Sequence, residues 1–218
     1  MDEPFSAALW AEAAPIWSAI QRHPFLAELR AGSLPLETFR YYVTQDYHYL
    51  EAFARAVATA LAKAPDADTL ELLAKRVLTP IERPLHNRLF ELAGLQLADV
   101  RAAEIAPTNL AYQNHMLAVA ARGGLGEIAA ALLPCPWTYH KLGEALEVAE
   151  HAVYTEWAGF YTAGLLRESV EAWCGFVDLA AERGGPEQRS AMRRAFMTSC
   201  RYEYLFWDAA YKRESWPI

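Results

Sequence analysis

The stretch FRYYVTQDYHYLEAFARAV (residues 39–57) decides the fold class, because its apolar side chains recur at steps of three and four. Such steps keep side chains on one face of an α-helix. The resulting stripe consists of Phe39, Tyr42, Asp46, Leu50, Phe53 and Val57. The stretch therefore predicts an amphipathic helix that carries one carboxylate, Asp46, on its apolar face.

Helical periodicity extends over the rest of the chain, and no run alternates with the period of two that is typical of strands. The segments that break the periodicity are Gly32–Pro35, Ala64–Asp66, Ala106–Thr108, Arg122–Gly124 and Arg183–Pro186. Gly is frequent just past helix ends and Pro in first turns. We predict an all-α fold of roughly seven to nine helices. No stretch has the composition of a linker, so we expect a single domain over residues 1–218.

The composition excludes several classes of protein. The chain has 218 residues, 54% of them hydrophobic, which is enough for a sizeable core. A formal net charge of −7 without a basic run argues against a nucleic-acid partner. Three scattered cysteines without a C-x-x-C pair argue against a disulfide framework and a zinc site. With neither a secretory leader nor an apolar membrane span, we expect a cytoplasmic protein in a reducing compartment.

Two further helical stripes carry reactive groups. They consist of Leu132, Cys135, Tyr139, Leu142 and Leu146, and of Phe196, Cys200, Glu203, Trp207 and Ala210. Burying a carboxylate costs several kcal/mol unless it is paired, so the inward positions of Asp46 and Glu203 require an explanation. A structural pairing and a catalytic site both explain them at this stage.

Cys135 lies between two prolines in the segment LPCPW (residues 133–137). Free cysteine usually packs as a small hydrophobe, and proline kinks or restarts a helix. The positive end of a restarted helix would stabilise a thiolate. The segment therefore fits an activated nucleophile and also fits a buried cysteine at a kink.

The chain has eleven tyrosines and seven tryptophans, and several share helices with the reactive groups. A flat heteroaromatic ring stacks well between such side chains while a few polar groups hold its edge. We therefore hypothesise a pocket for a ligand of this kind.

Four ordered blocks resemble the TenA (thiaminase II) family, and the resemblance extends from Phe5 to about Trp216. The blocks are YYVTQDYHYL (residues 41–50), PT with YQNHM (107–108 and 112–116), AAALLPCPWTY (129–139) and YEYLFW (202–207). The order and spacing of the blocks make chance an implausible source.

The resemblance implies a heme-oxygenase-like helical bundle without heme, usually a homotetramer, and we expect no cofactor or metal. It implies hydrolysis of 4-amino-5-aminomethyl-2-methylpyrimidine to the 5-hydroxymethyl compound in thiamin salvage, often with thiamin cleavage. The implied site residues are Cys135 as nucleophile, Glu203 as proton donor, Asp46, Tyr139 and Tyr161 as substrate-binding residues, and Tyr49 and Tyr112 near the thiol. His48 and Pro136 depart from common residues of the family, which leaves the preferred substrate open.

Other functions stay open beside this one. A non-catalytic carrier of thiamin or its pyrimidine would use the same aromatic pocket. A heme oxygenase would use His23 as proximal ligand, although a His before Pro at a helix start is more often structural. A transcriptional regulator would need a recognition helix, which the acidic chain does not display. Glu82 and His86 suggest a metal site with Asp46, but we favour a surface or core-edge pair.

Overall fold

The computed structural model describes residues 3–78 and 83–218, and it confirms the all-α fold: these residues form no strand. The helices are α1 (Phe5–Glu12), α2 (Ala14–Gln21), α3 (Pro24–Arg30), α4 (Leu36–Leu61), α5 (Ala67–Leu78), α6 (Arg83–Ala93), α7 (Leu97–Ala102), α8 (Pro107–Arg122), α9 (Leu125–Leu132), α10 (Pro134–Gly143), α11 (Ala152–Thr162), α12 (Arg167–Arg183) and α13 (Pro186–Lys212). Within the same ranges, no helix is long and apolar enough to cross a membrane.

All five predicted breaker segments separate helices. The expectation of roughly seven to nine helices was wrong, because the described ranges contain thirteen. Prolines explain part of the difference: Pro15 lies in the first turn of α2, Pro24 opens α3 and Pro134 opens α10. Proline lacks an N–H donor and fixes φ, so it divides a helix while the apolar spacing continues across the break.

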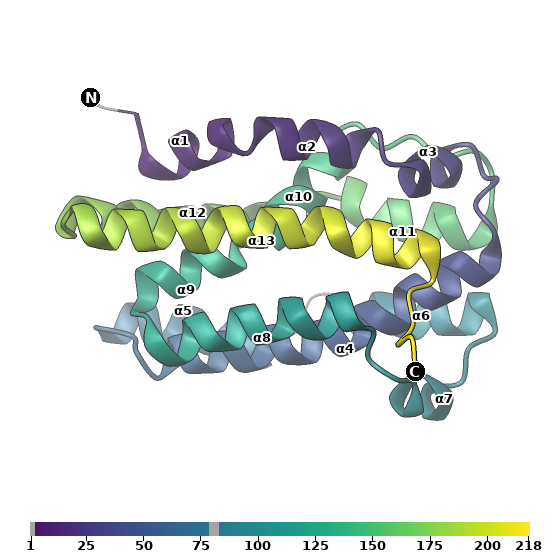
Figure 1. Cartoon of the computed structure of the whole chain (residues 1–218), viewed down its shortest axis with the longest axis horizontal. Helices are drawn as coiled ribbons and strands as arrows, with labels where there is room; N and C mark the ends of the chain where they lie inside the picture. Colours follow the sequence, from purple (N-terminus) through teal and green to yellow (C-terminus); the bar gives the residue numbers. More distant parts are fainter. Residues whose placement is uncertain (1–2, 79–82) are drawn as a thin grey trace.

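The longest helix, α13, runs through the middle of the bundle (Figure 1) and packs against α2, α4, α8, α9 and α10. On one side of α13 lie α1, α2 and α3, and on the opposite side lie α4 and α8 (Figure 1). Tyr42, Trp157 and Trp207 fill the interior and are each at most 1% exposed. The rings of Tyr42 and Trp207 stack with centroids 5.2 Å apart. This aromatic packing gives the site described below a rigid wall.

Gly143 allows α10 and α11 to approach each other closely. A Cβ atom at this position would lie 2.3 Å from the carbonyl oxygen of Tyr161, so no larger residue fits without a backbone shift. The close approach brings Tyr139 of α10 against Tyr161 of α11, with ring centroids 4.9 Å apart.

Candidate active site

Four helices surround a small cavity in the core. Its empty volume is about 180 Å³, and α4, α8, α10 and α13 supply its walls. The lining residues are Asp46, Tyr49, Tyr112, Cys135, Tyr139, Glu203 and Phe206. A thiol, two carboxyl groups and four aromatic rings therefore face one space.

Cys135 lies in the first turn of α10 and is 7% exposed. Leu133, two residues before Cys135, has helical dihedral angles (φ −55°, ψ −38°). The chain therefore passes from α9 into α10 through a kink without a loop. Pro134 and Pro136 cannot donate backbone hydrogen bonds, which explains the kink. The chain thus kinks at this point, and the thiol lies at the N-terminal end of a new helix. Its activation as a nucleophile stays a prediction.

Glu203 is 3% exposed and accepts a hydrogen bond of 2.7 Å from the Tyr112 hydroxyl. The Tyr112 ring stacks on Tyr202 with centroids 5.1 Å apart, which fixes the phenol. Burial, followed by the negative charge of Glu203, raises the pKa of Tyr112 well above its ordinary value. Tyr112 therefore stays protonated and acts as a hydrogen-bond donor to Glu203.

Asp46 is paired with a residue of a different helix. Its Oδ2 atom lies 2.8 Å from Nε2 of His86, which belongs to α6 and is only 2% exposed. The expectation that His86 belongs to a surface or core-edge pair was wrong, because the Asp46 carboxylate draws the imidazole into the core. Glu82, the other member of that pair, lies outside the described residues. Across residues 3–78 and 83–218, no three His, Cys, Asp or Glu side chains form a group that could hold a metal ion.

Tyr139 forms part of a buried network of polar aromatic groups. Its hydroxyl lies 2.9 Å from the Tyr42 hydroxyl, which also accepts a 3.3 Å hydrogen bond from the indole N–H of Trp157. Burial is the main cause that raises the pKa of Tyr139 well above its ordinary value. The network holds the Tyr139 ring in place and keeps its hydroxyl protonated.

Tyr49 brings a second phenol to the cavity. It is 3% exposed, its ring lies 5.0 Å from that of Tyr112 between centroids, and its hydroxyl interacts with the Tyr112 hydroxyl. Burial first, and then the charge of Cys135, raises the pKa of Tyr49 well above its ordinary value. Tyr49 therefore brings a protonated phenol to the cavity that Cys135 also lines.

Six of the seven residues implied by the resemblance line the cavity; Tyr161 lies behind Tyr139 and contacts the cavity wall through that ring. Sequence reasoning did not assign Phe206 to the site, and it did not predict the hydrogen bond between His86 and Asp46. Phe206 lies three residues after Glu203 on α13, so the helical stripe could have revealed it. His86 was noticed, but its contact with Asp46 spans 40 residues and leaves no local signal.

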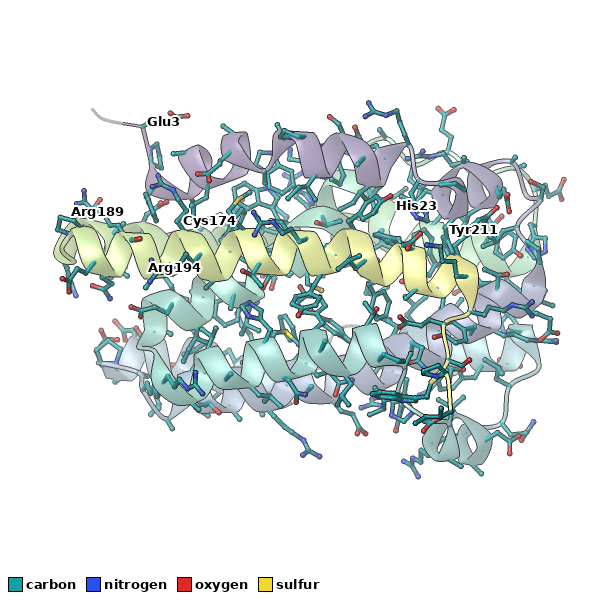
Figure 2. All side chains as sticks on the ribbon, viewed as in Figure 1. Glu3, His23, Cys174, Arg189, Arg194 and Tyr211 are labelled. Atoms are coloured by element: carbon teal, nitrogen blue, oxygen red, sulfur yellow. The ribbon has the colours of Figure 1, made fainter. Side chains whose placement is uncertain are left out.

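His23, the alternative heme ligand, has a structural role. Its Nδ1 accepts a 3.2 Å hydrogen bond from the backbone N–H of Phe25 and so caps α3. Nε2 lies 3.8 Å from an Asp208 carboxylate oxygen. Figure 2 shows His23 beside Tyr211, near the C-terminal end of α13. Burial lowers the pKa of His23. Both ring nitrogens thus face protein groups, as expected for a structural residue.

The other two thiols have different surroundings. Burial raises the pKa of Cys174 to about 11 and also raises that of Cys200. Neither thiol lines the cavity. Cys135 is therefore the cysteine that the fold presents to a ligand.

Comparison with known proteins places these features in one family. A model of the TENA/THI-4/PQQC family matches residues 10–213. The chain is 33% identical to the aminopyrimidine aminohydrolase of Halalkalibacterium halodurans, covering 97% of each chain. It is 35% identical to the enzyme of the same name from Bacillus subtilis, covering 97% of this chain and 92% of the relative.

Solved structures agree with this assignment. A TenA homologue from P. horikoshii OT3 superposes with a TM-score of 0.83 at 30% identity, covering 96% of this chain and 99% of that one. A protein with a heme oxygenase-like fold from Shewanella denitrificans OS217 superposes with a TM-score of 0.75 at 15% identity, covering 98% of this chain and 93% of that one. The second likeness confirms the predicted heme-oxygenase-like fold. The sequence blocks, the helical bundle and these matches together show that the chain belongs to the TENA/THI-4/PQQC family.

Proposed function

We propose that this protein is an aminopyrimidine aminohydrolase of thiamin salvage. Its substrate would be 4-amino-5-aminomethyl-2-methylpyrimidine, which reacts with water to give the 5-hydroxymethyl compound and ammonia. The observation that carries the proposal is the meeting of Cys135, Asp46 and Glu203 around one aromatic cavity of about 180 Å³. The names of the relatives from H. halodurans and B. subtilis support the same reaction.

The cavity suits a flat, polar ring. Aromatic side chains supply stacking surfaces, and a few polar groups at the edge provide selectivity. Asp46 would accept a hydrogen bond from the exocyclic 4-amino group. The protonated hydroxyls of Tyr49 and Tyr139 would donate to ring nitrogens, because burial keeps both phenols from ionising.

The reaction would proceed through a covalent intermediate. The Cys135 thiolate adds to an electron-poor ring carbon, and the electron pair displaced by the new C–S bond moves onto the ring nitrogens. Glu203 then protonates the aminomethyl nitrogen, which departs as ammonia. Water adds to the exposed exocyclic carbon and gives one proton back to the Glu203 carboxylate, and the C–S bond breaks to return the thiolate and the aromatic ring. A thiolate suits this role because it is strongly nucleophilic near neutral pH and also a good leaving group.

Thiamin cleavage would follow the same steps, with the thiazole ring as leaving group in place of ammonia. A carrier that only binds the pyrimidine is the second possibility, and it would need neither Cys135 nor Glu203. The expected homotetramer and the cytoplasmic location stay predictions. Light scattering of the purified chain tests the first of them.

The test is ammonia release from 4-amino-5-aminomethyl-2-methylpyrimidine, with thiamin assayed in parallel, by the wild type, Cys135→Ala and Cys174→Ala. Cys174 is a matched control because its half-buried thiol on α12 lies outside the cavity. We expect turnover in the wild type and Cys174→Ala and none above background in Cys135→Ala. Tight pyrimidine binding without turnover in any of the three proteins would favour the carrier.

A further inference from the structure

The residue that holds Asp46 in place comes from outside the cavity. His86 of α6 does not line the cavity, yet its Nε2 lies 2.8 Å from Asp46 Oδ2. The imidazole is almost parallel to the ring of Phe90, with an interplanar angle of 2° and centroids 5.8 Å apart. Tyr47 contacts it with a centroid distance of 6.2 Å. Packing thus fixes the plane of the imidazole before any ligand enters.

The chemistry of the pair assigns its proton. A carboxylate only accepts hydrogen bonds, so Nε2 of His86 carries the hydrogen and donates it to Oδ2. The terminal torsion of an aspartate is broad, and its carboxylate plane rotates easily when nothing holds it. With Oδ2 engaged by His86, the plane is set, and among the described residues none is recorded as a hydrogen-bond donor to Oδ1, which is therefore the oxygen that we assign to a ligand. Asp46 faces the cavity, so this oxygen can meet a donor on the substrate.

We propose that His86 is a positioning residue that gives the site its selectivity for pyrimidines with a 4-amino group. By fixing the Asp46 carboxylate, it directs one oxygen to the exocyclic amine. This inference rests on the proposed function, because it assumes that an aminopyrimidine occupies the cavity. A substrate of the same shape without the 4-amino group cannot donate this hydrogen bond, so the fixed carboxylate does not increase its affinity.

Two amide variants of His86 distinguish a role in orienting the Asp46 carboxylate from a role in stabilising the core. In His86→Gln, the side-chain N–H can reach about the position of the imidazole Nε2, so the hydrogen bond to Asp46 can persist. In His86→Asn, a buried amide of similar polarity remains but is one carbon too short. Both variants keep a polar group at the position, which limits the damage to folding. Thermal unfolding of both variants provides the check on stability.

The experiment titrates two non-reactive probes by calorimetry: 4-amino-5-hydroxymethyl-2-methylpyrimidine and the same compound with hydrogen in place of the 4-amino group. For His86→Asn we expect affinity for the amino probe to fall about tenfold or more, as for a lost hydrogen bond to a charged group. Affinity for the des-amino probe should change less than about threefold. His86→Gln should bind both probes nearly as the wild type does, and His86→Asn should raise KM more than it lowers kcat.

Several outcomes decide the matter. An equal loss for both probes in His86→Asn would show a merely structural role and overturn the inference. Identical behaviour of His86→Gln and His86→Asn, whether both resemble the wild type or both are equally impaired, would overturn it too. In either case a wild type that binds and hydrolyses the aminopyrimidine leaves the proposed function intact. If the wild type itself does not bind the amino probe, the proposed function fails and the role of His86 fails with it.

Discussion

The two carboxyl groups of the cavity are equally deep but have different partners. Asp46 and Glu203 are 8% and 3% exposed, respectively. Asp46 is paired with the imidazole of His86, and Glu203 with the phenol of Tyr112. The imidazole donates a ring N–H from α6, and the phenol, which burial keeps protonated, donates an O–H from α8. Burial alone therefore does not distinguish the two carboxyl groups, whereas their hydrogen-bond partners do.

Cys135 and Glu203 act on the same two tyrosines of the cavity. Besides burial, the charges of Glu203 and Cys135 raise the pKa of Tyr112, and the same two groups act on Tyr49. For Tyr139, the groups that follow burial are Tyr42, Asp46, Tyr161 and, last, Glu203, whereas Cys135 is not among them. The proposed function assigns Cys135 and Glu203 to a reaction end of the cavity and Asp46 to a recognition end.

Among the variants that test the two ends of the cavity, Glu203→Gln should have the largest effect on catalysis. The amide accepts the Tyr112 hydrogen bond but has no proton to deliver to the leaving amine. Loss of general acid help should lower kcat about 10²- to 10⁴-fold with little change in KM. Steady-state kinetics measure this, with the exposed Glu187→Gln on the same helix as control. A rise in KM with kcat unchanged from the wild type would show that Glu203 binds the substrate and would contradict its assignment to the reaction end.

A smaller effect, on a different parameter, is expected for Asp46→Asn. The amide introduced by this substitution would present an N–H where the 4-amino group needs an acceptor, and it would also weaken the contact with His86. Substrate affinity should fall about 10- to 100-fold, the range for a hydrogen bond to a charged group. The control is Glu51→Gln, an exposed position on α4. A loss confined to kcat would contradict the assignment of Asp46 to recognition.

Tyr112→Phe should have a still smaller effect. Removing one hydroxyl deprives Glu203 of its donor while the ring can still stack on Tyr202. We expect kcat to fall about 3- to 10-fold, as for a single hydrogen bond. Tyr211→Phe is a matched control, because that phenol donates a 2.6 Å hydrogen bond to Glu28, another carboxylate, outside the cavity. Equal losses in the two variants would remove the special role of Tyr112.

The smallest effect concerns a buried polar group away from the cavity and should appear in stability alone. Burial lowers the pKa of His23, although Asp208 acts in the opposite direction. The unfolded chain therefore binds a proton more readily, so the free energy of unfolding should decrease as pH falls through the ordinary histidine pKa of about 6.5.

His23→Asn tests this effect, because asparagine also caps helices but does not titrate. Denaturant titrations should show a shallower loss of stability below about pH 6.5 in the variant, with kcat and KM unchanged. A change in activity at constant stability would connect His23 to the cavity after all.

The same division explains what the sequence could predict. Cys135, Glu203 and Asp46 each lie on an apolar helical stripe, and periodicity alone showed that all three point inward. Their meeting in one cavity depends on how α4, α10 and α13 pack, which periodicity does not encode; the family resemblance supplied it. Neither the periodicity nor the family resemblance predicted the Asp46–His86 contact, because the two residues lie on separate helices. Part of the additional helices was not predicted because a proline in a first turn divides a helix without disturbing the spacing of its apolar residues.

The most direct measurement is the binding of 4-amino-5-hydroxymethyl-2-methylpyrimidine, which has no amine to release, to Asp46→Asn and Glu203→Gln side by side. Calorimetry then reports recognition without chemistry. The account predicts that Asp46→Asn binds about 10-fold or more weakly than the wild type, whereas Glu203→Gln binds within about threefold of it. Equal losses in both variants, or a loss in Glu203→Gln alone, would contradict the division of the cavity into a recognition end and a reaction end.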